Sequence, residues 1–430
     1  MKKILLGILL FPAIAFSQSS PIAFKGALIY TSNGDSIPNG VLLIQNGKIL
    51  SVGNAQTPVP SSAQIIDVTG KVIIPGIVDT HSHLGGPAGG DNSAALNPDT
   101  RALDAVNPTS DGFKKALAGG ITTINLMPGS GHLMSGQTIY VKMRPAIVIE
   151  DLLITNEKGV YGGLKMANGT NSIRSTPGFP GTRSKSAAMD RDLFMKAVEY
   201  RKKIRRAGND STKLPERDLR MESLVEVLEG KRIVHFHTHK AYDILTAMRI
   251  AKEFGFRIVL HHVTEAYLVA KQIADAKIPC SIINIDAPGG KEEAINLWHG
   301  NGGALEKAGI LTAIHTDDGI TDSRFILRSA AMSVKEGMSR KEALKALTIN
   351  GAEMLDLSSS VGSLQPGKDA DFVILSGDPF SVYTRVLETW VEGFKRFDLS
   401  NPADKAFAVG GFGVYSPDRG ELHTHEDDHQ

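Results

Sequence analysis

The chain has 430 residues, of which 42% are hydrophobic and 22% charged, and 47 basic against 46 acidic residues leave a formal net charge of +1. This is globular composition, which excludes a disordered, collagen-like or coiled-coil chain. The balanced charge argues against nucleic acid and anionic membranes as partners, because both are bound largely through bulk charge. The single cysteine, Cys280, excludes an internal disulfide and a zinc site built from several thiolates.

Residues 1–17 have the pattern of a signal peptide. Lys2 and Lys3 precede an apolar run over residues 4–16, which is shorter than the roughly 20 residues that span a bilayer. Ala15 and Ser17 stand at the −3 and −1 positions that signal peptidase requires before residue 18. We therefore expect a periplasmic or secreted protein with no membrane attachment after cleavage. A buried strand or an uncleaved anchor is the alternative.

Residues 18–74 and 357–415 share one pattern. Both alternate apolar and polar residues with a period of two, and Asn-Gly turns separate the runs in the first segment, which is typical of antiparallel strands. The two segments are predicted to pair into one small β-sandwich. The polar, His-rich tail over residues 416–430 is expected to lie outside it.

Residues 75–356 follow a different pattern, in which short apolar runs alternate with helical ones. The apolar runs are GIVDTHSHL, ITTINLM, RIVHFHTH, RIVLHHV, IPCSIINI and LTAIHTD. The helical ones include DGFKKALAGG, AYDILTAMRIAKEFG, TEAYLVAKQIADAK and KEEAINLWHGNGGALEKAG. Such alternation predicts an α/β fold with parallel strands. About eight strands favour a closed (β/α)8 TIM barrel inserted in the β-sandwich. A doubly wound open sheet is the alternative, but the chain lacks its Gly-rich fingerprint.

Histidines gather at the ends of these predicted strands. His81 and His83 have the i, i+2 spacing that places both imidazoles on one side of a strand, and imidazole is a good ligand for zinc. Later strand ends carry His235, His237, His239, His261, His262 and Asp317. Several such residues at successive strand ends are hard to explain by packing, because each buried imidazole needs a partner. The pattern predicts a divalent metal site.

Four segments carry a resemblance to a known family: PGIVDTHSHLG, GGITTINLMPG, AYDILTAMRIAKEFGFRIVLHHVTEAY and VGSLQPGKDADFVILSGDP. With them the chain resembles the metal-dependent amidohydrolase superfamily, and within it the secreted imidazolonepropionase-like branch. The resemblance implies a TIM barrel flanked by a β-sandwich. It also implies an enzyme that hydrolyses a carbon–nitrogen bond in an amide or cyclic amide.

The family's metal ligands can be placed by position. They match His81, His83, Lys165, His237, His262 and Asp317. Lys165, in YGGLKM, matches a lysine that many relatives carboxylate to bridge two metals. Zinc is the expected metal, as one or two ions. If Lys165 is unmodified, a mononuclear site of His81, His83, His237 and Asp317 is the alternative, with His262 near the substrate.

The expected reaction is attack of a metal-activated hydroxide on the substrate carbonyl, with Asp317 as proton shuttle. The partner is a small-molecule substrate, and both peptide-like amides and lactams are open. His132, Tyr161 and Arg324 are candidate substrate contacts, although Arg324 can equally be an ion-pair residue. The competing hypothesis is a catalytically inactive secreted metal- or ligand-binding protein. A homo-oligomer is left open.

Overall fold

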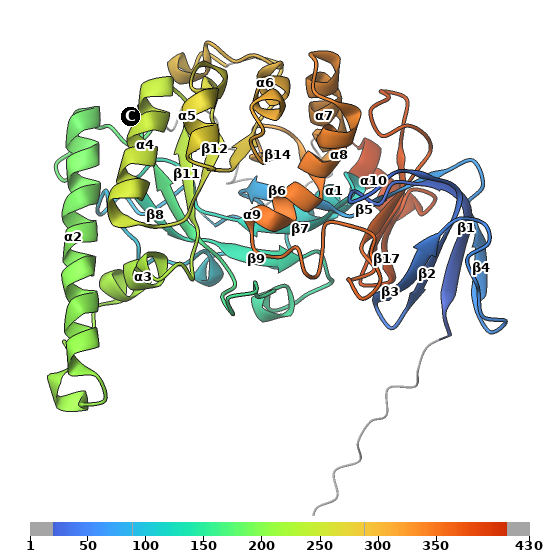
Figure 1. Cartoon of the computed structure of the whole chain (residues 1–430), viewed down its shortest axis with the longest axis horizontal. Helices are drawn as coiled ribbons and strands as arrows, with labels where there is room; N and C mark the ends of the chain where they lie inside the picture. Colours follow the sequence, from blue (N-terminus) through green and yellow to red (C-terminus); the bar gives the residue numbers. More distant parts are fainter. Residues whose placement is uncertain (1–19, 88, 288, 411–430) are drawn as a thin grey trace, which may run out of the picture.

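The computed structural model describes residues 20–87, 89–287 and 289–410. The predicted signal peptide and the His-rich tail lie outside these residues. A mixed α/β fold is confirmed, with a β-sheet at one end and a larger part of strands and helices beside it (Figure 1).

The sheet at one end combines the N-terminal and C-terminal segments, as predicted. Its strands follow the order β17-β16-β15-β5-β1-β2-β3, and β4 also pairs with β1. Their bounds are β1 Ile22–Ile29, β2 Ile37–Gln45, β3 Lys48–Gly53, β4 Gln64–Asp67, β5 Val72–Pro75, β15 Phe372–Leu375, β16 Val386–Val391 and β17 Phe394–Asp398. These strands form one sheet, so a sandwich of two layers stays a prediction.

The turn between β2 and β3 could be predicted from its residues. Asn46 and Gly47 both have positive φ, at 52° and 77°, as an Asn-Gly hairpin requires. The prediction that all these strands are antiparallel was wrong for two of them. Strands β4 and β5 run parallel to β1, one beside each half of it, because the chain crosses over after β3 instead of turning back.

The larger part contains two further sheets. One has the order β14-β13-β12-β11-β10-β8 and the other β6-β7-β9. Their bounds are β6 Ile77–Ser82, β7 Ile121–Leu126, β8 Met134–Gln137, β9 Ile139–Lys142, β10 Leu164–Ala167, β11 Val234–Thr238, β12 Ile258–His262, β13 Cys280–Ile282 and β14 Thr312–Ile314. Strands β10 to β14 are mutually parallel, as are β6 and β7.

The stretch between β7 and β10 differs from the predicted alternation. It holds β8, antiparallel to β10, and β9, antiparallel to β7. A parallel connection takes about a dozen residues and is usually a helix. Residues 127–133 between β7 and β8 are too few for such a crossover.

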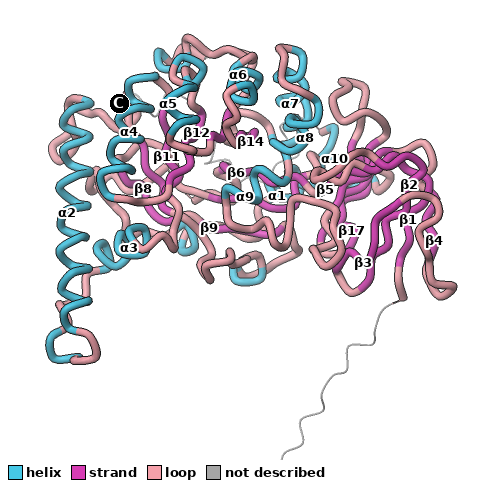
Figure 2. The backbone as a smooth tube through the Cα atoms, in the orientation of Figure 1, coloured by secondary structure: helices cyan, strands magenta, loops and turns pink. Residues whose placement is uncertain are grey.

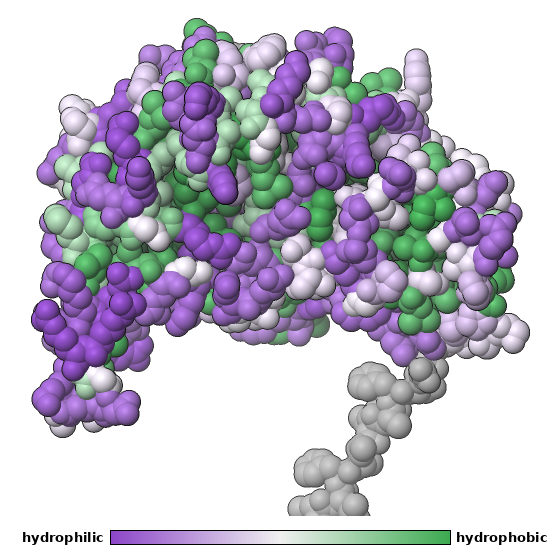
Figure 3. Space-filling model, viewed as in Figure 1, coloured by the Kyte–Doolittle hydropathy of each residue, from purple (hydrophilic) through white to green (hydrophobic). Residues whose placement is uncertain are grey.

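Helices connect the parallel strands and lie outside them (Figure 2). Their bounds are α1 Asp111–Ala118, α2 Arg183–Ala207, α3 Leu219–Leu228, α4 Ala241–Phe254, α5 Ala270–Asp275, α6 Asn301–Lys307, α7 Ile326–Lys335, α8 Arg340–Leu347, α9 Ile349–Met354 and α10 Pro402–Val409. Short 3-10 turns are η1 Ala102–Asp104, η2 Ile149–Asp151, η3 Ser211–Lys213, η4 Ala266–Leu268, η5 Glu292–Ala294 and η6 Ser323–Phe325. The far end of α2 projects from the body and is strongly hydrophilic (Figure 3).

The helix predicted over KEEAINLWHGNGGALEKAG is broken. Only η5 and α6 form within it. Between them the chain leaves the helical path, and Glu293 turns its side chain inward, where that side chain is 2% exposed and accepts a hydrogen bond from the backbone N–H of Thr170. A regular surface helix would not bring that side chain to a distant loop.

The two sheets of the larger part meet at the ends of β6 and β14. The backbone N–H of Asp317 donates to the carbonyl oxygen of His81 at 2.9 Å, and that of Thr316 donates to Oδ1 of Asp79 at 3.2 Å. On the other side, the N–H of Tyr140 in β9 donates to the carbonyl oxygen of Tyr161, which precedes β10, at 2.6 Å. Full closure into a barrel stays a prediction. In the described part of the chain, the helices fall short of the combined length and apolarity that a membrane crossing requires.

Candidate metal centre

The histidine pair of β6 lies at the middle of the site. His81 is the last residue but one of the strand and is fully buried, whereas His83 follows the strand and stays partly exposed. Their Nε2 atoms lie 3.3 Å apart. The strand therefore aims both imidazoles at one point, as their i, i+2 spacing predicts.

Asp317 and Lys165 add a carboxylate and an amine to this point. Oδ1 of Asp317 lies 2.9 Å from Nε2 of His83 and 3.3 Å from Nε2 of His81. Nζ of Lys165 lies 3.0 Å from Nε2 of His81. Ligands of a tetrahedral zinc ion with bonds near 2.1 Å are about 3.4 Å apart, so these atoms need only a small adjustment to share one ion.

The protonation states of His81 and Asp317 suit metal binding. Burial lowers the pKa of His81 well below its usual value, and the positive charge of Lys165 acts in the same direction. Burial opposes ionisation of Asp317, but the hydrogen bond and charge of His83, with His315 and Lys165, outweigh it and lower the pKa of that carboxyl. Neutral imidazole and ionised carboxylate are the forms that bind metals.

Lys165 lies on β10 and is fully buried. Besides His81, its Nζ contacts Sδ of Met127 at 3.2 Å. Burial lowers the pKa of Lys165 to about 7, although the charge of Asp317 opposes this and that of Lys291 adds to it. An amine that is about half unprotonated near neutral pH can act as a nucleophile, which is what carboxylation by carbon dioxide requires.

His237 on β11 and His262 at the end of β12 lie side by side next to this group. Their ring centroids are 4.4 Å apart, and Nδ1 of His262 is 3.9 Å from Oδ2 of Asp317. Both rings are buried, and Nδ1 of His237 and Nε2 of His262 have no hydrogen-bond partner among the described residues. Because buried polar atoms almost always have a partner, these nitrogens fit a bound cation.

His315 belongs to the site but was missed in the sequence. Its Nε2 lies 3.1 Å from Nδ1 of His262, its Nδ1 lies 2.7 Å from Oγ of Ser281, and its ring stacks on that of His81 at 4.9 Å. The available signal was its position two residues before Asp317, directly after β14.

His261 and His235, whose contribution the sequence left undecided, support His81 from behind. Nδ1 of His81 lies 3.2 Å from Nδ1 of His261, and Nε2 of His261 lies 3.0 Å from Nδ1 of His235. This series of side-chain contacts ends at the hydroxyl of Tyr140, which lies 3.4 Å from Nε2 of His235. Such contacts orient a metal ligand and fix which of its ring nitrogens carries the proton.

His239 and Glu293 form a further group with His237. One ligand atom of each lies within 4.8 Å of the others. All three side chains are buried, and neither Nε2 of His239 nor Oε2 of Glu293 has a hydrogen-bond partner among residues 20–87, 89–287 and 289–410. The sequence left the role of His239 in metal binding undecided. It gave no signal for Glu293, which lies in a predicted helix.

Two predicted substrate contacts lie in different places. The ring of His132 packs against Phe179 with centroids 5.4 Å apart, and its Nε2 lies 3.2 Å from Oδ1 of Asn92. Tyr161 precedes β10, and the guanidinium of Arg232, before β11, lies 5.9 Å from its ring. Tyr161 is therefore at the amino ends of the strands, whereas the metal ligands are at the carboxyl ends.

Arg324 takes the ion-pair role that the sequence left open. Its guanidinium bonds to Oδ2 of Asp322 at 2.7 Å and to the carbonyl oxygen of Gly410 at 2.9 Å. These contacts attach η6 to the end of α10, so the structure gives Arg324 a structural contact in place of a free guanidinium.

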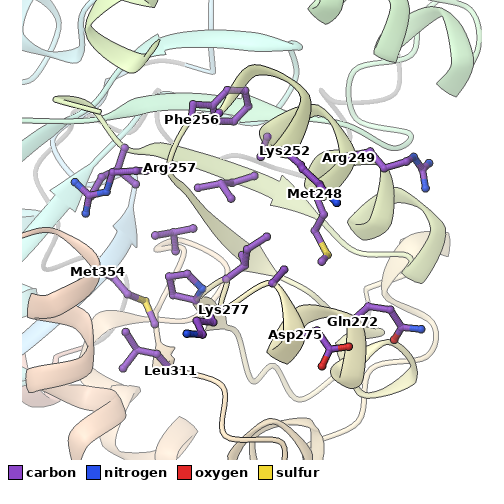
Figure 4. A pocket seen from close by; sticks show the side chains of 18 of the residues that line it. Met248, Arg249, Lys252, Phe256, Arg257, Gln272, Asp275, Lys277, Leu311 and Met354 are labelled. Atoms are coloured by element: carbon purple, nitrogen blue, oxygen red, sulfur yellow. The ribbon is translucent and has the colours of Figure 1, made fainter. Parts of the chain in front are cut away.

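A separate pocket of about 1120 Å³ lies at the opposite ends of the strands (Figure 4). Ile233 before β11 and Leu311 before β14 line it, together with Met248 of α4 and Gln272 of α5. The ligands of the candidate centre follow or end their strands, so this pocket is not part of it.

A cluster of imidazoles and a carboxylate at the carboxyl ends of parallel strands is the arrangement of a metal-dependent enzyme. A family model described as "Amidohydrolase family" matches residues 281–394. The solved structure of an amidohydrolase from Thermotoga maritima MSB8 is 35% identical, covers 88% of this chain and all of its own, and superposes with a TM-score of 0.82. The chain belongs to the metal-dependent amidohydrolase superfamily.

Curated relatives agree with this assignment. Amidohydrolase tasK of Hapsidospora irregularis is 27% identical over 90% of this chain, which spans 44% of the length of that relative. An imidazolonepropionase of Fusobacterium nucleatum subsp. nucleatum is 22% identical over 80% of this chain and 87% of its own. The predicted class, an enzyme acting on carbon–nitrogen bonds, is thereby confirmed.

Proposed function

We propose that the protein hydrolyses an amide or cyclic amide bond of a small molecule at a zinc centre held by His81, His83 and Asp317. The observation that carries this proposal is the convergence of Oδ1 of Asp317 on both Nε2 atoms, within 3.3 Å. The histidine-plus-carboxylate set is one that zinc favours. Relatives named as amidohydrolases and as an imidazolonepropionase support the reaction class.

The residues of the chain have separate tasks. A bound divalent ion supplies a Lewis acid for the carbonyl oxygen and lowers the pKa of water. Asp317 accepts a proton from the attacking water and passes it to the leaving nitrogen as the C–N bond breaks. The oxygen of the water stays on the carbonyl carbon, so an amide gives a carboxylic acid and an amine, and a cyclic amide opens to one molecule that carries both groups.

Lys165, His237 and His262 are the proposed ligands of a second ion. Reaction of Nζ with carbon dioxide turns the amine of Lys165 into an anionic carbamate that can bridge two ions. The orphaned Nδ1 of His237 and Nε2 of His262 support this placement. The carbamate also removes the unfavourable burial of a lysine cation at 0% exposure.

The experiment is metal analysis combined with an activity panel. Full-length protein is loaded with zinc and assayed against simple amides, lactams and dipeptides, with Asp317→Asn as the inactive comparison. Turnover of one class that depends on added zinc and is lost in Asp317→Asn supports the proposal. Zinc-independent turnover, or equal activity of Asp317→Asn, contradicts it.

We further propose that the two sheets of the larger part close into a (β/α)8 barrel over residues 75–356, between the sandwich segments 18–74 and 357–415. Hydrogen bonds of Asp317 to His81 and of Tyr140 to Tyr161 support closure on both sides. A crystal structure with a strand gap wide enough to admit solvent would contradict it.

Export is proposed from the N-terminal pattern alone. Mass spectrometry of protein from a bacterial host that secretes it should find Gln18 as the first residue. A soluble cytoplasmic form that retains Met1 would contradict both the signal peptide and the periplasmic or secreted location.

A further inference from the structure

Strand β11 repeats the motif of β6. His237-Thr238-His239 has the same i, i+2 spacing as His81-Ser82-His83, at the same carboxyl end of a parallel strand. Each pair has one carboxylate beside it, Asp317 for the first pair and Glu293 for the second. We propose that His237, His239 and Glu293 bind a divalent cation at a position that does not use Lys165.

The three side chains meet the chemical requirements of such a site. Two imidazoles and a glutamate form a ligand set found in zinc enzymes. One ligand atom of each lies within 4.8 Å of the others, and no residue of the three is more than 6% exposed. Atoms within this limit can share one ion after at most a modest inward movement of the ligands.

Unpartnered atoms are the second, independent observation. Among the described residues, Nδ1 of His237, Nε2 of His239 and Oε2 of Glu293 are buried without a hydrogen-bond partner. Nδ1 of His237 also fits the second-ion position of the proposed function, but Nε2 of His239 and Oε2 of Glu293 have no role there, and two such orphans on neighbouring side chains point to an occupant of their own.

Glu293 is held so that one oxygen stays available. The backbone N–H of Thr170 donates to Oε1 at 2.6 Å, and Arg183 donates to the same oxygen at 3.3 Å. Gly169 makes this approach possible, because a Cβ at that residue would lie 2.1 Å from Oε1. Both fixed contacts engage Oε1, which leaves Oε2 for the ion.

The histidines are held in the same way. Nδ1 of His239 lies 2.7 Å from Oγ1 of Thr264, which leaves Nε2. Nε2 of His237 lies 3.3 Å from the side-chain amide of Asn171. When Nδ1 of His237 binds an ion, Nε2 carries the proton, and a flip of that amide turns its oxygen to accept it.

His237 is shared with the second-ion position of the proposed function, so the two positions are alternatives. The inner position uses carboxylated Lys165, His237 and His262. The outer position uses His237, His239 and Glu293 and needs no carbon dioxide. The inference rests on the metal dependence of the proposed function, but His239 and Glu293 have no part in that function.

The test is metal binding by full-length protein freed of metal with a chelator and kept in bicarbonate-free buffer. Zinc is titrated by calorimetry, and the bound ions are counted by mass spectrometry after gel filtration. We expect two ions per chain for the wild type and for Lys165→Ala. Glu293→Gln should retain one, because the amide keeps the size of the side chain but not its charge. Glu292→Gln, at the exposed neighbouring glutamate, is the matched control and should bind two.

The outcomes separate this inference from the proposed function. Two ions bound with unchanged affinity by Glu293→Gln, or one ion bound by Lys165→Ala, would overturn the outer site while leaving the His81 centre intact. Loss of both ions in Glu293→Gln with a native circular dichroism spectrum would also overturn it, because the sites would not be separate. His239→Asn is the second variant and should repeat the loss of one ion.

Discussion

Two His-x-His pairs end two parallel strands of this protein, and they differ in how the carboxylate reaches them. Asp317 follows β14 along the chain, so it arrives at the same edge as His81 and His83 by strand order alone. Glu293 reaches His237 and His239 from η5, in the connection after β13. The same ligand types thus result from two kinds of structure, one regular and one irregular.

The two groups also differ in access. The side chains of His83 and Asp317 are 12% and 15% exposed, whereas that of Glu293 is 2% exposed. A substrate must reach the carboxylate that moves its proton, so catalysis belongs to the open group. A closed group can hold an ion but offers little room for chemistry.

The sharpest way to separate the groups is to remove the charge of each carboxylate. Asp317→Asn should lower kcat by about 100-fold to 10,000-fold, because an amide cannot act as a base. Glu293→Gln should leave a much larger share of the activity in zinc-saturated protein with bicarbonate present. Steady-state kinetics on the substrate class found by the panel measure both, and equal losses would mean that the groups are not distinct in function.

Removing one histidine from each pair should affect metal binding differently. His81→Ala should lower the affinity of the first group for its ion by at least about 100-fold, because the substitution removes a direct ligand. His237→Ala should keep that ion and lose the second in either of its positions. Zinc titration against a competing chelator distinguishes the two variants, and identical titration curves would show that the pairs hold one shared site.

Only the first group contains a buried lysine, and this predicts a pH effect. The pKa of Lys165 falls from 10.5 to about 7 in the folded protein. Between these values the unfolded chain binds a proton that the folded chain lacks, so the free energy of unfolding rises with pH, by at most about 1.4 kcal/mol per unit. Below pH 7 both states are protonated and the effect is absent.

Urea unfolding of metal-free protein at pH 7 and pH 9 measures this, with Lys165→Met as the reference. The wild type should gain stability relative to the variant as pH rises. A difference that stays constant, or that shrinks, would show that the buried amine is not destabilising when charged.

The smallest effect concerns the glycine beneath Glu293. Gly169 and Gly178 both have positive φ, at 79° and 88°, but only Gly169 has an atom in the path of a Cβ. Alanine at either position should cost about 1 kcal/mol of unfolding free energy from backbone strain. Gly169→Ala should in addition displace Glu293 and lower the affinity for the second ion. Zinc titration of the two variants compares their affinities.

Much of the catalytic centre could be predicted from the sequence. The spacing of His81 and His83, and the position of Asp317 at the end of a later apolar run, are properties of strands that parallel pairing brings to one edge. The turn at Asn46 and Gly47 could also be predicted from its own two residues, because few residue pairs other than Asn-Gly adopt positive φ at both positions. Local periodicity is enough to predict the position of a side chain wherever the backbone of a regular element sets its direction.

The tertiary structure decided what depends on contacts between distant segments. Glu293 and Asn171 reach His237 from loops whose paths no periodicity describes. Tyr161 lies at the wrong ends of the strands for the predicted role, since its place depends on where β10 begins. His315 joins the site because its side chain packs against His81 across the meeting of two sheets. Such placements follow from packing and hydrogen bonds between residues far apart in the chain, and these interactions leave no periodic signal in the sequence.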